Sequence, residues 1–172
     1  MTAYQWLTAQ QAQHELPALC AVLDACIAEG ASIGFIHLDP EVLRHFWQDA
    51  ALSLACGDKQ LLVARIEGEI VATVMLALAM PPNGVHRAEV VKLLVHPRAR
   101  RRGIARQLMC RAEQRAWQAG RTLLVLDTRS GDVAESLYHQ LGWQVAGRIP
   151  ACARSTAGEQ DSTTLMYKQR SV

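Results

Sequence analysis

Apolar residues recur at helical spacing in the first third of the chain. Four aliphatic side chains lie three or four residues apart: Leu16, Leu19, Leu23 and Ile27. This spacing predicts an amphipathic helix with Pro17 in its first turn and Gly30 after its end. Asp39 and Pro40 are typical of an N-cap and a first helical position, so a second amphipathic helix is predicted from there.

The middle of the chain changes to strand-like runs at residues 61–66, 69–79 and 87–95. A Glu-Gly pair lies between the first two runs, and the sequence Pro-Pro-Asn-Gly precedes the third. Such residues form turns, so the three runs predict an antiparallel meander.

A helical pattern over residues 103–119 and an apolar run over residues 122–127 come next. A strand, a helix and a strand in this order predict a parallel crossover. Asp132 and Glu135 have the spacing of a capping box, with Ser130 as an alternative cap, which predicts that another helix begins there and ends before Gly142.

Two final strands are predicted at residues 143–149 and 164–168, joined by a polar loop. The chain is therefore expected to form one domain over residues 1–172. Its fold class is mixed α/β, with an antiparallel N-terminal meander, a central parallel crossover and flanking helices.

Composition excludes several classes of protein. The chain has 172 residues, of which 50% are apolar and 20% are charged, so a disordered chain is not expected. No segment has the roughly 18 consecutive apolar residues of a spanning helix, and the first residues do not resemble a signal peptide. We therefore expect a cytoplasmic protein with no membrane partner. The 5 cysteines are scattered and lack zinc-ligand spacing, so no metal site is predicted.

Positive charge is concentrated in the second part of the chain. Residues 1–96 contain 5 Lys and Arg against 10 Asp and Glu, whereas residues 97–172 contain 13 against 6. This asymmetry predicts either an anionic ligand near the arginine-rich segment or a solvated basic face. The acidic first part argues against the broad basic surface that a nucleic-acid partner needs.

A loop suited to phosphate lies between the third strand-like run and the next helix. Pro97 stops the strand, arginines follow, and Gly103 and Ala105 keep the side chains small where the helix begins. Free N–H groups and the dipole at a helix start favour an anion. The motifs of P-loop and dinucleotide-binding proteins are absent, which argues against phosphoryl transfer and dinucleotide redox chemistry.

Two motifs together resemble the GNAT superfamily of N-acetyltransferases. The first, V-x-P-x-x-R-x-x-G-x-A at residues 95–105, is similar to the acetyl-CoA motif of that family. The second, A-x-x-x-Y-x-x-x-G-W at residues 134–143, resembles its second motif, and the order of elements matches over nearly the whole chain. The resemblance implies a GNAT-like mixed sheet and an N-acetyltransferase that uses acetyl-CoA as its acyl donor.

The resemblance also implies roles for particular residues. Loop amides would hold the CoA pyrophosphate, and the end of the preceding strand would pair with the pantetheine arm. The residues implied to bind acetyl-CoA are Leu94, Val95, Arg100, Arg101, Arg102, Gly103, Ile104, Ala105 and Arg106. Tyr138 would be the general acid, and a phenol with a pKa near 10 can protonate a departing thiolate. Its alternative role is that of a core aromatic residue.

One position departs from the family pattern. Many members carry an asparagine seven residues before the tyrosine, and this chain has Gly131 there. The side-chain contact with the cofactor arm is therefore either absent or supplied by Asp132 or Ser130.

Two carboxylates are candidates for holding the acceptor amine or removing its proton. Glu89 interrupts an apolar strand, where a carboxylate is costly unless it faces a cleft or is paired; an ion pair with Arg87 or Lys92 is the alternative. Asp127 ends a strand at the carboxyl edge of a parallel pair, where open α/β sheets bind ligands. A turn or cap is its alternative role.

Three stretches, at residues 30–35, 83–90 and 126–128, resemble acetyltransferases that detoxify tabtoxin-type amino-acid toxins. This implies direct acetylation of a small amino-acid-like amine, an antibiotic or toxin among the candidates, in a ternary complex. Glu89, Asp127 and Phe35 would line its site. Acetylation of a protein or peptide is the second interpretation, and a basic nucleic-acid-binding module is the third. Family analogy allows a homodimer.

Overall fold

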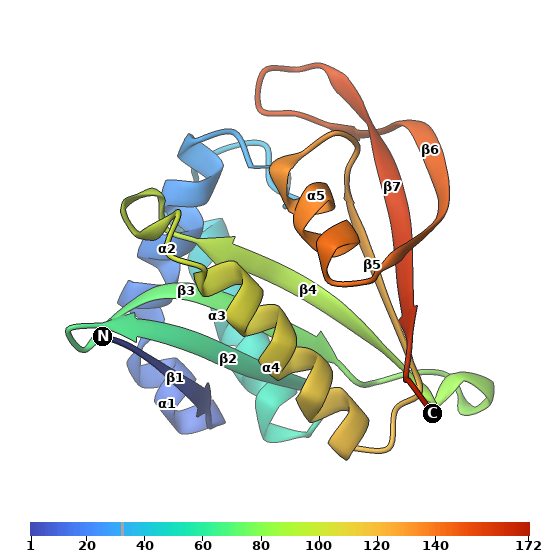
Figure 1. The fold of residues 1–172 in the computed structure, drawn as a ribbon. Helices are drawn as coiled ribbons and strands as arrows, with labels where there is room; N and C mark the ends of the chain where they lie inside the picture. Colours follow the sequence, from blue (N-terminus) through green and yellow to red (C-terminus); the bar gives the residue numbers. More distant parts are fainter. Residues whose placement is uncertain (32) are drawn as a thin grey trace.

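The fold is built on a seven-stranded sheet with helices on both faces (Figure 1). The computed structural model describes residues 1–31 and 33–172, so Ser32, within the 30–35 stretch noted above, lies outside the described residues. The helices are α1 (Ala9–His14), α2 (Leu16–Ala28), α3 (Pro40–Ala55), α4 (Ile104–Gln118) and α5 (Val133–Gln140). The strands are β1 (Thr2–Leu7), β2 (Lys59–Ile66), β3 (Glu69–Ala77), β4 (Arg87–Val95), β5 (Leu123–Arg129), β6 (Gln144–Arg154) and β7 (Gln160–Gln169).

The strand order is β1-β2-β3-β4-β5-β7-β6, and the neighbouring strands are antiparallel except for β4 and β5. The predicted meander is confirmed as β2, β3 and β4. The predicted parallel crossover is confirmed as β4, α4 and β5. Strand β7 inserts between β5 and β6, so the last two strands form an antiparallel hairpin that extends the sheet beyond the crossover.

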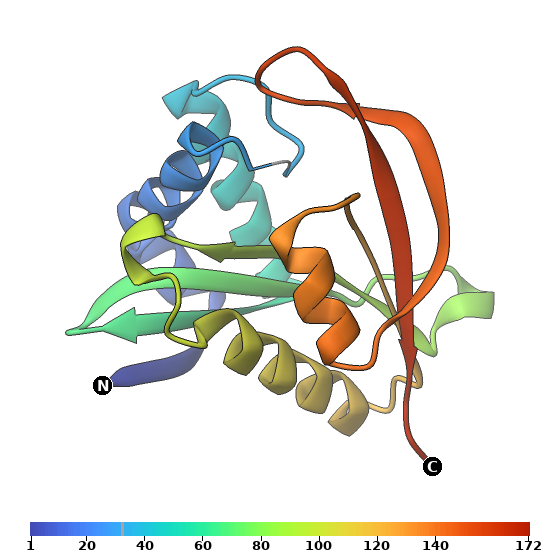
Figure 2. The same cartoon turned by 45° about the horizontal axis from the view of Figure 1, so that its top comes forward.

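Helices lie on both faces of the sheet, as Figure 2 shows from a second direction. A layer of buried apolar side chains lies between the helices and the sheet on each face. The α2/α3 face packs α1, α2 and α3 against side chains such as Leu61, Met75 and Leu94. The α4/α5 face packs α4 and α5 against the opposite side chains of the same strands. Successive side chains along a strand point to opposite faces of the sheet. A polar strand residue therefore lies on the face opposite to the layer that contains its apolar neighbour in the sequence.

Helix caps follow the predicted signals in part. The N-cap Asp39 accepts a hydrogen bond from the Glu41 N–H at 3.0 Å, as the Asp-Pro pair predicts. The reciprocal capping box predicted for α5 was wrong. Asp132 Oδ1 accepts from the Val133 N–H at 2.9 Å, but the Glu135 carboxylate reaches one residue further back and accepts from the Gly131 N–H at 2.7 Å.

The first fourteen residues contain two elements that the periodicity analysis missed. Strand β1 pairs with β2 along its whole length, and Arg111 and Arg115 of α4 lie over the Tyr4 and Trp6 rings at 4.3 and 4.1 Å. Helix α1 begins at a capping box between Thr8 and Gln11, a sequence signal that could have revealed it. None of the helices within residues 1–31 and 33–172 is long and apolar enough to cross a membrane.

Candidate active site

The loop before α4 presents a row of backbone amides. Arg101 and Gly103 both have left-handed backbone angles, with φ of 63° and 74°. Within the described residues, the N–H groups of residues 101–106 have no hydrogen-bond acceptor in the protein, and the first bond into α4 runs from Gln107 N to Gly103 O. A non-glycine residue at positive φ stores strain, which is typical of functional loops. The loop therefore has the geometry of an anion site.

The arginines of this loop do not all face the same way. Arg98 pairs with Glu69 at 2.9 Å. Arg100 donates its Nε–H to the Val95 carbonyl at 3.3 Å and lies 3.8 Å from Glu29, and its own N–H donates to the Pro97 carbonyl. Arg101 and Arg102 are exposed, and Arg106 donates to the Gln140 side chain. Arg100 therefore braces the loop against β4 and α2, outside the amide row in which the sequence placed it.

Strands β4 and β5 separate beside this loop. They pair only where Arg87, Ala88 and Glu89 meet Leu123, Leu124 and Val125, although both strands continue beyond (Figure 1). A separation between parallel strands leaves main-chain groups on their facing edges without partners.

The register of β4 decides which residues face this separation. The His96 N–H donates to the Val71 carbonyl at 2.8 Å. In an antiparallel pair every second residue directs its N–H and C=O groups at the neighbouring strand, so Leu94, two residues before His96, also turns its main-chain groups toward β3. Leu93 and Val95 turn theirs toward β5. Of the pair predicted from sequence, Val95 therefore faces the separation. Leu94 instead contributes a buried side chain, and Leu93 is the residue that the sequence reasoning missed.

A β-bulge interrupts β4 at Lys92. The register shifts between Thr73 and Met75 of β3, Lys92 has φ 54°, and its carbonyl accepts the Thr73 hydroxyl at 2.9 Å. Val91 and Leu94 both pack on the α2/α3 face, whereas Leu93 and Val95 pack on the α4/α5 face. The extra residue therefore reverses the alternation of side chains along the strand.

The two candidate carboxylates lie on the α2/α3 face. Glu89 is opposite Ala77 of β3, which is in turn opposite Lys59 of β2, and Asp127 follows Leu126, whose side chain is in the opposite layer. Burial and the nearby Asp127 carboxylate raise the pKa of Glu89, whereas the charges of Lys59 and Lys92 lower it by less. Among the described residues neither carboxylate has a cation within 4.0 Å, so the ion pair weighed above for Glu89 does not form.

Tyr138 lies on the other face of the sheet. Its side chain is 6% exposed in the α4/α5 layer, with its ring centroid 6.1 Å from that of Trp143. Burial raises the pKa of the Tyr138 hydroxyl well above its usual value, and the charges of Asp132 and Asp127 raise it further. Tyr138 is therefore both a core aromatic residue and a protonated phenol near Asp127, so the two roles weighed for it are compatible.

The polar groups around Gly131 already have hydrogen-bond or ion-pair partners within the protein. The Ser130 hydroxyl is 2.7 Å from the Thr164 hydroxyl, and Asp132 caps α5 and lies 3.7 Å from Arg129. Glu135, which is buried, accepts from the Gly131 N–H and from Arg148. This arrangement favours the alternative in which the family's asparagine contact is absent.

Phe35 lies in the loop between α2 and α3, beside a cavity of about 190 Å³. The loop of the β6–β7 hairpin forms the opposite wall. The cavity is lined by Ala31, Gly34, Phe35, Ile36, Ala153, Arg154, Ser155 and Thr156. The Phe35 ring is also 5.7 Å from the Lys92 ammonium, so it connects this cavity with the charged side chains on β4.

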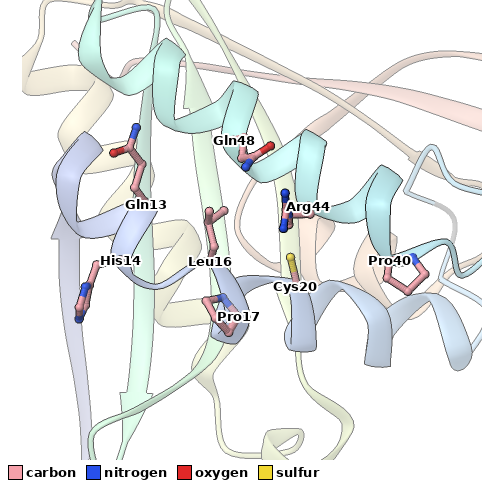
Figure 3. Close-up of a pocket in the computed structure, with 8 residues that line it drawn as sticks. All are labelled: Gln13, His14, Leu16, Pro17, Cys20, Pro40, Arg44 and Gln48. Atoms are coloured by element: carbon pink, nitrogen blue, oxygen red, sulfur yellow. The ribbon is translucent and has the colours of Figure 1, made fainter.

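A larger groove of about 650 Å³ lies elsewhere, between α1, α2 and α3 (Figure 3). None of the sequence-predicted site residues lines it. Its lining residues are Gln13, His14, Leu16, Pro17, Cys20, Pro40, Arg44 and Gln48. Size alone therefore does not identify the site, because the amide row, the separated strands and the carboxylates are all outside this groove.

Comparison with protein families agrees with this geometry. Residues 28–143 match the acetyltransferase (GNAT) family. An uncharacterised N-acetyltransferase of the hisH-hisA intergenic region of Azospirillum brasilense is 28% identical over 148 residues, which cover 83% of this chain and 86% of that protein. The chain therefore belongs to the GNAT family and is an N-acetyltransferase.

Solved structures share the fold at low identity. A ribosomal-protein-alanine N-acetyltransferase from Brucella melitensis is 23% identical with a TM-score of 0.80, covering 98% of this chain and 99% of that one. YncA from Salmonella typhimurium, whose structure contains its cofactor acetyl-CoA, is 18% identical with a TM-score of 0.79, covering 100% of this chain and 95% of that one.

Acetyl-CoA is the acyl donor of this family, and the residues present fit it. The amides of residues 101–106 suit a diphosphate, and the separated edges of β4 and β5 leave main-chain groups for an extended amide-containing arm. Within the described part of the chain no group of three or more His, Cys, Asp or Glu side chains could hold a metal ion.

Proposed function

We propose that the acceptor is a primary amine on a small amino-acid-like molecule, an antibiotic or toxin among the candidates, and that it attacks acetyl-CoA directly in a ternary complex. One observation carries this proposal. Glu89 and Asp127 lie on the α2/α3 face beside the separated strands, while Tyr138 lies on the opposite face. A proton acceptor and a proton donor thus flank the place where the two strands part.

The chemistry requires both groups. Bound acetyl-CoA supplies an activated thioester. An alkyl amine with a pKa of about 10.4 is mostly protonated at neutral pH, so a base must take one proton from it. Glu89, with its raised pKa, is the base, and Asp127 holds the ammonium form as it approaches. As the carbon–nitrogen bond forms and the carbon–sulfur bond breaks, the Tyr138 hydroxyl donates its proton to the sulfur. The attacking nitrogen then gives up its second proton, which returns to the Tyr138 oxygen and leaves a neutral amide.

A cavity that reaches Phe35, whose ring centroid lies 5.7 Å from the Lys92 ammonium, supports a small acceptor over a polypeptide. The cavity next to Phe35 has a volume of about 190 Å³ and is walled by two loops. The alternative function, acetylation of a protein or peptide, requires an open groove through which a chain can continue.

A screen of amines tests the proposal. The purified protein is incubated with acetyl-CoA and a library of amino acids, small amines and short peptides, while release of the free thiol is followed. We expect amino-acid-like amines to give the fastest release. Release with peptides alone would replace the proposal with the peptide alternative.

Replacing Glu89 with Gln is expected to lower kcat/KM by about 100-fold to 10,000-fold, the usual contribution of a general base. Because the pKa of Glu89 is raised, the wild-type rate increases with pH over a range above that of an ordinary glutamate. This limb of the pH–rate profile is expected to disappear in Glu89→Gln. An unchanged profile would assign the base to another group, and Glu67→Gln, in an exposed turn, is the matched control.

Glu89→Gln is expected to lower activity without lowering the stability of the fold. A carboxyl whose folded-state pKa is raised stabilises the fold below its unfolded pKa of about 4.3, and this contribution is lost as the pH rises through the folded-state value. At neutral pH the ionised Glu89 therefore lowers stability. Thermal denaturation is expected to show that Glu89→Gln is at least as stable as the wild type, which separates loss of the base from loss of the fold.

A further inference from the structure

We propose that Lys92 recognises an anionic group on the acceptor, such as the carboxylate of an amino acid. This inference rests on the proposed function, because the acceptor amine is taken to approach Glu89 and Asp127. It assigns Lys92 a role in specificity, since its ammonium would select zwitterionic acceptors over simple amines.

The β4 bulge aims Lys92 at the acceptor. Without the extra residue, strict alternation from Glu89 through Val91 would turn the Lys92 side chain into the α4/α5 layer. With the bulge, its ammonium reaches the α2/α3 face and donates to the Ile33 carbonyl at 3.0 Å. A lysine at φ 54° is strained, and such strain is retained where it positions a side chain.

The surroundings of Lys92 leave its charge incompletely satisfied. The ammonium lies 5.7 and 5.2 Å from the centroids of the Phe35 and Phe46 rings, and the Ile33 carbonyl is its one hydrogen-bond acceptor among the described residues. An ammonium has three N–H donors, so two are available to a ligand. Burial and the charge of Lys59 lower the pKa of Lys92, as expected for a cation that lacks a close anion.

The charges around Lys92 fit a ligand that carries both signs. Glu89, Asp127, Lys59 and Lys92 lie close enough for their charges to influence one another. Yet within the described residues no ion pair within 4.0 Å involves any of the four. Two carboxylates and two ammonium groups kept apart in one place suit a zwitterion, whereas a polyamine would call for an excess of carboxylates.

Matched acceptors test the proposal directly. Amino acids that the screen finds to be acetylated are compared with their primary carboxamides, which lose the negative charge and little else, and rates are corrected for the fraction of free amine. A charge-assisted hydrogen bond predicts that kcat/KM for the acid exceeds that for the amide by at least about tenfold. Lys92→Met retains the packing against the two rings and is expected to bring this ratio close to one.

Three results would overturn the assignment. If Lys92→Met lowered the rates of acid and amide by the same factor, the lysine would serve only to hold the loop through Ile33. Lys59→Met removes the same charge two strands away from Glu89. If it reduced the acid-to-amide ratio of kcat/KM as much as Lys92→Met does, the combined electric field of the charged cluster would be responsible instead of Lys92. Wild-type acetylation without any preference would also contradict this inference while leaving the proposed function standing. No acetylation of any amine would instead refute the proposed function.

Discussion

Tyr138→Phe is expected to lower kcat by about 100-fold or more while leaving the affinity for acetyl-CoA unchanged. The substitution removes one hydroxyl and keeps the ring that packs in the α4/α5 layer near Trp143. A general acid acts in the transition state, so its loss affects turnover more than binding. Steady-state kinetics with an acceptor from the amine screen, together with calorimetric titration of acetyl-CoA, measure the two quantities separately.

The pH dependence sharpens this test. A general acid must be protonated, and a raised pKa keeps the Tyr138 hydroxyl protonated to a higher pH than the usual value of about 10. Wild-type activity is therefore expected to persist through the alkaline range in which an exposed tyrosine would ionise. Tyr167→Phe removes a hydroxyl that bonds Gln144 at 2.7 Å on the β6–β7 hairpin, and it is expected to leave kcat unchanged. Equal activity of Tyr138→Phe and wild type would remove Tyr138 from the mechanism.

Gly103→Val is expected to weaken acetyl-CoA binding by about 100-fold or more. Gly103 has φ 74°, and the position of its missing side chain is open, with nothing within 4 Å. A valine side chain would add bulk within the row of free amides of residues 101–106, which the diphosphate must approach closely. Losing one or two charge-assisted hydrogen bonds accounts for an effect of this size. Calorimetric titration measures it.

Strain must be separated from loss of the anion site. Gly120 has φ 83° and also has nothing within 4 Å, but it lies at the other end of α4. Gly120→Val therefore carries a similar conformational cost without touching the amide row. Both variants are expected to lower the thermal midpoint by similar amounts, whereas only Gly103→Val loses affinity. Unchanged acetyl-CoA affinity in Gly103→Val would move the diphosphate to another place.

Periodicity predicted the elements that bury a continuous apolar face. Strand β4 and helix α4 were found nearly to the residue, because each places side chains in a packed layer. Strands β6 and β7 are longer than predicted. Most β6 residues are exposed, and its register against β7 shifts twice, so the alternation that identifies a strand is lost there.

The candidate site was predictable where a motif or an unusual residue marked it. The loop around Gly103, Tyr138, and the carboxylates Glu89 and Asp127 all break an otherwise apolar or regular pattern. Lys92 gave no such signal, because a lysine beside a strand end is common on protein surfaces. The bulge that turns it inward depends on the pairing of β4 with β3, through the Thr73 hydroxyl among others.

The sequence by itself determined the order of elements from α2 onward and the family, and it predicted the anion loop, since these depend on local spacing and on motifs of neighbouring residues. Only the tertiary structure decided that Leu93 faces the strand separation instead of Leu94, that Arg100 braces β4, and that Lys92 lies beside Phe35. The first and the last of these depend on the register between β3 and β4, whereas the Arg100 contacts depend on the packing of the end of α2 beside the loop. A shift of one residue in that register turns every following side chain to the other face of the sheet.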